Sequence, residues 1–173
     1  MCAKRAKQST AGIVICAHCG GSQRCKFNCL NMIRVAIADD HSLLRQAWVF
    51  ILSRIAGISI VAECANGEEA ITAVQKYTPD IILMDINMEP MNGIQAAERI
   101  SKQYPRTRII AMSVHKDMSY VNRMLRAGAS GFVTKNSPSE EMVEAIKLVN
   151  KGQTYLCEEI RASYNSPDRR QGL

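Results

Sequence analysis

The sequence predicts an α/β fold: a doubly wound sheet of five parallel strands, with five helices packed on it. From Met32 onward, short β-branched runs alternate with longer segments of helical period, which is the order that a parallel sheet with crossover helices requires. Several of the short runs are almost wholly apolar, as expected for strands buried on both faces. The predicted strands cover residues 33–38, 58–65, 81–84, 108–113 and 131–134.

The predicted helices follow from apolar periodicity and from start and stop signals. Residues 42–56 place apolar side chains on one helical stripe and end before Gly57, a residue suited to a left-handed cap. A second helix over residues 68–77 begins after Asn66 and is stopped by Pro79. The remaining helices are expected at residues 93–103, 119–127 and 138–151.

The helix expected at residues 138–151 has the most complete start signal. Ser137 can cap it, and Pro138 suits the first helical position because no hydrogen-bond donor is lost there. Glu140 can reach back to the cap amide, which completes a capping box.

Composition divides the chain into three segments. Residues 1–31 contain five of the seven cysteines and five basic residues but no acidic residue, and we expect them to form a Cys-rich, basic and disordered extension. Residues 32–152 hold the predicted strands and helices and form the domain. After Gly152 the helical period is lost, so residues 153–173 are expected to be a linker or a C-terminal tail.

The positive net charge does not indicate nucleic-acid binding by the domain. The formal charge is +6 at pH 7, but the five basic residues of segment 1–31 account for most of it, so the remainder is close to neutral. In that remainder Cys64 and Cys157 form no disulfide framework, which suggests a reducing, cytoplasmic setting. No apolar run is long enough to cross a bilayer, so we expect no membrane partner.

Polar residues follow four of the predicted strands directly. In an open parallel sheet, functional groups collect beyond the carboxyl ends of the strands, so residues far apart in sequence meet at one rim. The residues concerned are Asp39 and Asp40 after the first strand, Asp85 after the third, Ser113 at the end of the fourth and Lys135 after the fifth. We expect these side chains to form one site.

Such a site has the chemistry of phosphoryl transfer. Close carboxylates repel each other by about 4 kcal/mol per pair at an effective dielectric of about 20, so a counter-cation is needed. Mg²⁺ suits a site that offers a few protein oxygens and leaves room for water and a phosphate. The Lys135 ammonium can approach a phosphoryl oxygen, while an aspartate serves as the nucleophile.

This arrangement resembles the signature of two-component response regulator receiver domains, in order and in spacing. The NarL/FixJ (LuxR-type) branch of transcriptional response regulators has segments similar to IRVAIADDHSLLRQA, LMDINMEPMNG, AMSVHK and AGASGFVTK. The resemblance covers about residues 32–152 and implies the flavodoxin-like receiver fold, with strand order 2-1-3-4-5.

The resemblance also implies a role for each residue at the rim. Asp85 would accept a phosphoryl group from a sensor histidine kinase, or from a small donor such as acetyl phosphate, with Mg²⁺ as cofactor. Asp40 and Asp85 would bind Mg²⁺ through their carboxylates, and Asp39 would act mainly through metal-bound water. Asn87 would offer its backbone carbonyl to the metal, and Lys135 would pair with the phosphate.

A conformational switch is implied as well. Ser113 would turn its hydroxyl to a phosphoryl oxygen, and Phe132, in the position of the family's switch aromatic residue, would move inward. The output would be a population shift in the face made by the fourth helix, the fifth strand and the fifth helix, which would also serve a homodimer. Such a protein is a signalling switch and not an enzyme, beyond self-phosphorylation from small donors and self-dephosphorylation.

The sequence departs from the family in one loop. Glu89 stands four residues after Asp85, where the family has proline, and Pro90 comes one place later. We expect the Glu89 carboxylate to face solvent, as charged loop residues usually do. His41 and His115 flank the site and are expected in partly exposed loops.

Two other functions compete with the receiver. A phosphatase of the haloacid dehalogenase type also uses an aspartate nucleophile and Mg²⁺, but it needs a second Asp where this chain has Asn87. A zinc-binding module is the other, although the five residues between its two cysteine pairs make a tight spacing. Its four thiolates would come from Cys16, Cys19, Cys25 and Cys29.

The length of the chain bears on DNA binding. NarL/FixJ regulators carry a helix-turn-helix domain after the receiver, and the residues after Gly152 are too few to form one. We therefore expect DNA contact only through an output domain absent from this chain, which would be the regulatory part of a DNA-binding transcriptional regulator. The alternative is a stand-alone receiver that acts through protein contacts.

Overall fold

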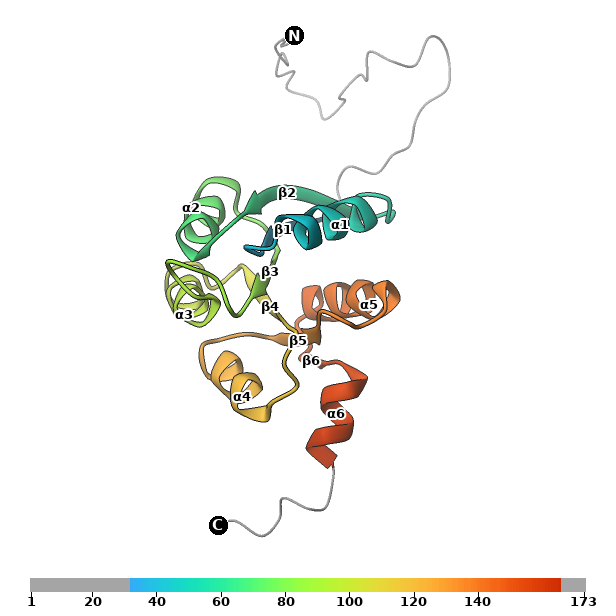
Figure 1. The fold of residues 1–173 in the computed structure, drawn as a ribbon. Helices are drawn as coiled ribbons and strands as arrows, with labels where there is room; N and C mark the ends of the chain where they lie inside the picture. Colours follow the sequence, from blue (N-terminus) through green and yellow to red (C-terminus); the bar gives the residue numbers. More distant parts are fainter. Residues whose placement is uncertain (1–31, 166–173) are drawn as a thin grey trace, which may run out of the picture.

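Strands and helices alternate from Ile33 to Asn165 in the computed structural model, which describes residues 32–165 (Figure 1). The strands are β1 (Ile33–Ala38), β2 (Ile58–Cys64), β3 (Ile81–Asp85), β4 (Arg108–Ser113), β5 (Gly131–Thr134) and β6 (Tyr155–Leu156). The helices are α1 (Ser42–Leu52), α2 (Gly67–Tyr77), α3 (Gly93–Gln103), α4 (Met118–Arg126), α5 (Ser139–Asn150) and α6 (Glu158–Asn165). The predicted α/β fold class is confirmed.

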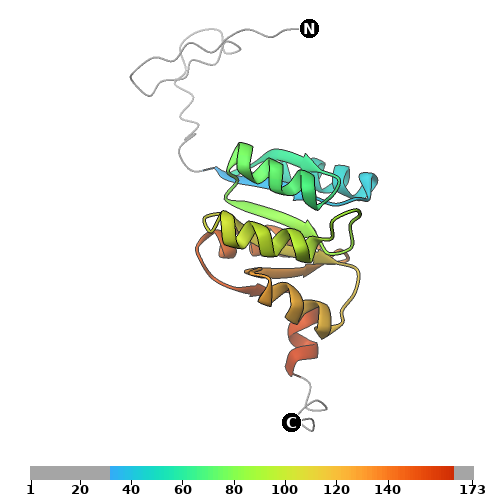
Figure 2. The same cartoon turned by 90° about the vertical axis from the view of Figure 1, so that its left-hand side faces the viewer.

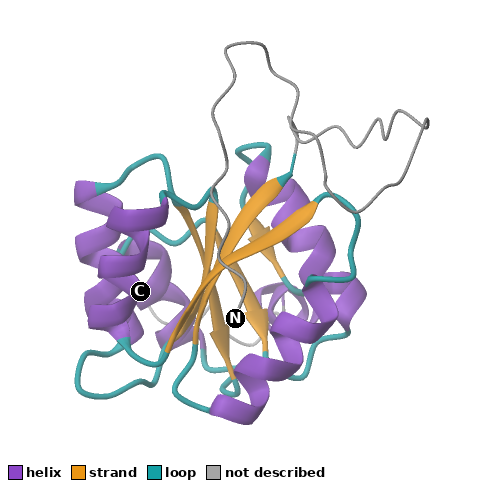
Figure 3. Ribbon diagram, turned by 90° about the horizontal axis from the view of Figure 1, so that it is seen from above, coloured by secondary structure: helices purple, strands orange, loops and turns teal. Residues whose placement is uncertain are grey.

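The strands form one parallel sheet in the order β2-β1-β3-β4-β5-β6. The order 2-1-3-4-5 implied by the resemblance is therefore confirmed, and β6 extends the sheet beyond β5. Helices α1 and α5 cover one face, whereas α2, α3 and α4 cover the other (Figures 1 and 2). Seen from above, the twisted strands lie between these two helical layers (Figure 3).

The middle of the sheet is buried on both faces. Every residue of β3 is buried, as are residues 35–38 of β1 and residues 109–113 of β4. This burial explains why these segments are nearly continuous apolar runs instead of alternating ones. The polar residues at their carboxyl ends are therefore held by a rigid core.

The predicted helix ends agree with the structure to within one residue except at the end of α1, and the start of α5 lacks the predicted cap. Helix α1 ends at Leu52 and not at residue 56, because Arg54 and Ile55 donate their N–H groups to carbonyls three residues back, which tightens the chain into a turn. Helix α5 begins at Ser139 after Pro138, without a side-chain cap. The expected cap residue Ser137 instead places its hydroxyl 3.0 Å from the hydroxyl of Thr134.

The largest difference lies after Gly152. Residues 153–165 were expected to belong to a linker or tail, but they contain β6, which pairs with β5, and α6, which contacts α4. Their side chains Tyr155, Cys157 and Ile160 are buried. Three apolar positions are too few to produce a helical period, and their burial depends on the otherwise open edge of β5.

Gly93 allows α3 to begin directly beside the end of β3. Its N–H donates to the carbonyl of Ile86 at 2.9 Å, and its Cα lies against the backbone of Asp85. A Cβ at this position would collide with the Asp85 carbonyl group, and a backbone atom cannot move aside as a flexible side chain does. Only glycine fits this close approach.

We predict that Gly93→Ala destabilises the fold by about 2–4 kcal/mol, because the methyl group forces the backbone of Asp85 to shift. Urea denaturation measures the change. Gln95→Ala, an exposed position of the same helix, is the control and should change stability by less than about 0.5 kcal/mol. Equal midpoints for the two variants would contradict the packing described.

Candidate functional site

The Lys135 ammonium lies between two carboxylates that come from different strands. Asp39 follows β1, Asp85 is the last residue of β3, and Lys135 follows β5. Lys135 Nζ is 2.8 Å from Asp39 Oδ2 and 2.9 Å from Asp85 Oδ2. All three side chains are almost fully buried, with exposed fractions of 5% for Lys135, 0% for Asp39 and 4% for Asp85. One ammonium thus bridges two buried acids.

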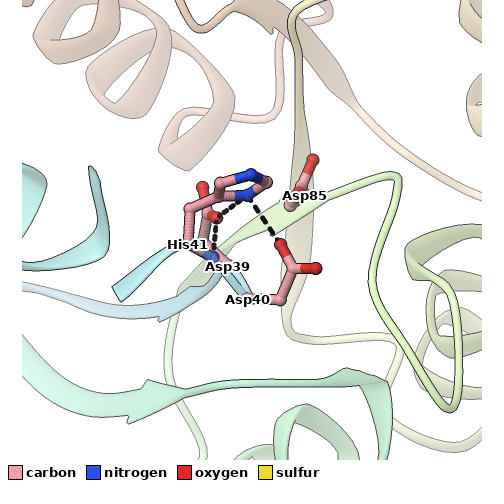
Figure 4. A group of neighbouring side chains, drawn as sticks. All are labelled: Asp39, Asp40, His41 and Asp85. Atoms are coloured by element: carbon pink, nitrogen blue, oxygen red, sulfur yellow. Dashed lines mark hydrogen bonds and ion pairs between the residues drawn. The ribbon is translucent and has the colours of Figure 1, made fainter. Parts of the chain in front are cut away.

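Asp40 and His41 lie beside Asp39 and Asp85 (Figure 4), and their side chains are the exposed ones of these four. The imidazole Nδ1 of His41 lies 2.8 Å from Asp40 Oδ1 and 3.5 Å from Asp39 Oδ1. The backbone N–H of His41 donates to Asp39 Oδ1 at 2.8 Å. The His41 side chain is 71% exposed, which confirms the prediction of an exposed loop residue. One potential ligand atom from each of Asp39, Asp40, His41 and Asp85 lies within 4.8 Å of the others.

The charges at this rim do not balance. Burial raises the pKa of Asp85; the Lys135 ammonium opposes the rise, and the nearby Asp39 charge adds to it. Asp39 Oδ2 and Asp85 Oδ2 are buried; each forms an ion pair with Lys135 and, among the described residues, has no hydrogen-bond partner. Three carboxylates close to one buried ammonium fit a hard divalent cation such as Mg²⁺, which prefers oxygen ligands.

Ser113 lies at the rim as the last residue of β4, and it is buried. Its hydroxyl accepts a hydrogen bond of 3.0 Å from the N–H of His115. The imidazole of His115 stacks on the ring of Tyr120 in α4, with centroids 5.5 Å apart. The serine hydroxyl is therefore linked to the loop that leads into α4.

Phe132 is fully buried in β5. The resemblance implies that this residue moves inward on activation, but the ring is already inside in this structure. Strand β6 covers the edge of β5 at this point, since the N–H of Cys157 donates to the Phe132 carbonyl at 3.0 Å. A phenyl ring also lacks a hydroxyl group that would favour contact with solvent.

The loop after β3 carries the two remaining predicted positions. Asn87 is exposed, and its N–H makes a long hydrogen bond of 3.4 Å to Asp85 Oδ1. The metal contact of its carbonyl stays a prediction. Glu89 is exposed, as expected for a solvated loop carboxylate, while Met88 and Met91 are buried and anchor the loop.

Sequence reasoning missed Arg45 in the first turns of α1. Its guanidinium donates to the backbone carbonyl of Asp39 and lies 3.9 Å from Glu63 Oε2 of β2. The side chain is only 17% exposed, so it helps to hold the loop that carries the acidic pair. The one signal in the sequence was that Arg45 follows the acidic pair by about one helical turn. Its contact with the Asp39 backbone carbonyl could not be predicted, because a backbone carbonyl is present at every residue.

The four cysteines of the predicted zinc site lie outside the described residues, so that prediction is not tested. The described cysteines, Cys64 and Cys157, are free and buried, and burial raises the pKa of the Cys64 thiol to about 12. Among residues 32–165, no helix is long and apolar enough to cross a membrane.

We predict that Asp85→Asn stabilises the metal-free protein by about 1 kcal/mol at about pH 7, because it removes a buried charge beside Asp39. The folded-state pKa of Asp85 is raised above its usual 3.8, so the stability this group contributes is present below 3.8 and is lost as pH rises through the folded-state pKa. The gap between variant and wild type should therefore widen as pH rises from 3.8 through the folded-state pKa of Asp85.

Urea denaturation in a chelator at several pH values measures this gap. Glu89→Gln, which removes an exposed carboxylate from the neighbouring loop, is the control and should show a gap below about 0.5 kcal/mol throughout. A gap for Asp85→Asn that narrows as pH rises would contradict the electrostatic description.

Residues 35–147 match the family model described as the response regulator receiver domain. The chain is 40% identical over 126 residues to the transcriptional regulatory protein DegU of Brevibacillus brevis, and the match covers 73% of this chain and 53% of DegU. It is 36% identical over 129 residues to the response regulator GacA of Pseudomonas viridiflava, and this match covers 75% of this chain and 60% of GacA. The chain thus spans less than two thirds of the length of these relatives.

Solved structures show the same likeness. A LuxR-family two-component response regulator from Aurantimonas sp. SI85-9A1 is 31% identical with a TM-score of 0.73, and the match covers 76% of this chain and 94% of that one. The signal receiver domain of the response regulator NarL from Mycobacterium tuberculosis is 32% identical with a TM-score of 0.69, covering 71% of this chain and 99% of that one.

Proposed function

We propose that this chain, which belongs to the response regulator receiver family, is a switch whose Asp85 accepts a phosphoryl group in a Mg²⁺-dependent reaction. The buried Lys135 ammonium, 2.9 Å from Asp85 Oδ2, is the observation that carries the proposal. Among residues 32–165, Asp85 Oδ1 accepts only the long hydrogen bond from the Asn87 N–H. This oxygen is therefore the better nucleophile toward phosphorus.

Lys135 and Asp39 have different roles in the phosphoryl transfer to Asp85. As the new phosphorus–oxygen bond forms and the bond to the donor breaks, Lys135 pairs with a phosphoryl oxygen, and Asp39 keeps the ammonium in place. Mg²⁺, when bound by the carboxylates of Asp40 and Asp85, the backbone carbonyl of Asn87 and, through water, Asp39, supplies further positive charge.

The donor that we propose is the phosphohistidine of a sensor histidine kinase, or a small acyl phosphate such as acetyl phosphate. The chain then acts as a signalling switch in the cytoplasm, and its own catalysis is limited to self-phosphorylation from small donors and self-dephosphorylation. The receiver match over residues 35–147 argues against the haloacid dehalogenase alternative.

The output that we propose is regulation of transcription. The matched region covers 53% of DegU and 60% of GacA, and DegU is called a transcriptional regulatory protein. This supports a regulatory segment that controls DNA binding by a separate output domain; a stand-alone receiver acting through protein contacts is the alternative. The predicted homodimer face of α4, β5 and α5 carries β6 and α6 in this structure. Dimerisation there requires these elements to take part or to move.

Intact-mass analysis after incubation with acetyl phosphate and Mg²⁺ tests the acceptor. We expect the wild type to gain one phosphoryl group and Asp85→Asn to gain none, because the asparagine side chain is no nucleophile toward phosphorus. Glu89→Gln should be labelled like the wild type, since Glu89 is an exposed carboxylate outside the cluster. Equal labelling of wild type and Asp85→Asn would refute the proposal.

A further inference from the structure

The segment after α5 is built into the edge of the sheet. The N–H of Tyr155 donates to the carbonyl of Ser130, and the N–H of Cys157 donates to the carbonyl of Phe132, each at 3.0 Å. The side chains of Cys157 and Ile160 are fully buried. Residues 155–163, which comprise β6 and most of α6, therefore occupy the edge of β5 that would otherwise be open.

Helix α5 also holds this segment. One carboxylate oxygen of Glu141 accepts the N–H of Glu158 at 2.7 Å and the hydroxyl of Tyr155 at 3.3 Å. The guanidinium of Arg161 lies 5.8 Å from the centre of the Tyr155 ring on the segment itself. The start of α6 is thus fixed to α5 by a charged acceptor.

An ion pair connects the same segment to the rim. Lys116, in the loop between β4 and α4, pairs with Glu159 of α6. The Lys116 ammonium lowers the pKa of Glu159, so the carboxylate is charged at neutral pH. Lys116 follows His115, whose N–H donates to the Ser113 hydroxyl. A short series of contacts therefore runs from Ser113 to α6.

We propose that residues 155–163 form a latch on the edge of β5, and that phosphorylation of Asp85 loosens this latch through residues 113–116. The proposal rests on the proposed function, because it requires Ser113 to turn toward a phosphoryl oxygen. When the hydroxyl turns, the hydrogen bond from the His115 N–H is lost and the loop that carries Lys116 can move. The equilibrium then shifts from the docked latch toward the released one.

Release of the latch has two consequences. Residues 155–163 leave the edge of β5, so the change at Asp85 reaches β6 and α6. The edge of β5 also becomes available for pairing with another strand, and the face of α4, β5 and α5 is uncovered. A partner that binds this face must therefore compete with the latch.

Hydrogen–deuterium exchange of the full chain tests the latch without phosphorylation. Lys116→Glu and Glu159→Lys should each speed exchange in α6 by about two- to five-fold, because each replaces an attraction with a repulsion at a surface position. The double variant Lys116→Glu/Glu159→Lys should restore slow exchange. Glu158→Lys makes the same charge change in the same first turn of α6 but breaks no ion pair with Lys116, so it is the matched control and should speed exchange less than Glu159→Lys does. Wild-type exchange in both single variants would overturn the latch.

The coupling is tested by repeating the exchange after acetyl phosphate and Mg²⁺, with intact mass measured on the same samples. Phosphorylated wild type should exchange faster in α6, with no change in α2, which packs near the opposite edge of the sheet on β1 and β2. Phosphorylation of Glu159→Lys should add little, since the connection is already broken. Uptake of phosphate without faster exchange in α6 would overturn the coupling and leave the proposed function intact. Absence of phosphate uptake would instead refute the proposed function, and the coupling with it. The charge-swap variants would then still test whether residues 155–163 form a latch.

Discussion

The ion pairs of Lys135 with Asp39 and Asp85 are the interaction on which the rest of the site depends. In the sheet order, β4 separates β5 from β3, so the long lysine side chain reaches from the end of β5 across β4 to the two acids. Two buried carboxylates without a cation would be expensive to keep charged, because burial removes them from water. The ammonium therefore ties three strand ends together and keeps Asp85 available for chemistry.

The sheet and the rim could be predicted because they follow from simple rules. Apolar runs become buried strands, and the carboxyl ends of parallel strands meet, so Asp39, Asp85 and Lys135 had to converge once the strand order was known. Individual hydrogen bonds could not be predicted from such rules. Arg45 donates to the Asp39 backbone carbonyl, and the Ser137 hydroxyl contacts the Thr134 hydroxyl instead of capping α5. Neither contact follows from the spacing of residues in the sequence.

The sheet edge shows a different limit of prediction. Tyr155, Cys157 and Ile160 are buried only because β5 offers an edge to cover, and this depends on contacts between elements far apart in space. The same edge explains why Phe132 is already inside, since β6 pairs beside it. In the proposed mechanism, Phe132 and the latch are coupled, and phosphorylation changes the docking of a segment rather than the position of one ring.

Borohydride reduction of the phosphorylated chain, followed by peptide mass analysis, tests the central claim most directly. The reagent reduces an aspartyl phosphate to homoserine and leaves ordinary carboxylates unchanged, so it marks the acceptor residue itself. If Lys135 and the acidic cluster prepare Asp85 for phosphoryl transfer, homoserine appears at position 85 and at no other aspartate. Homoserine at Asp39 or Asp40, or a phosphorylated chain without homoserine, would contradict the account.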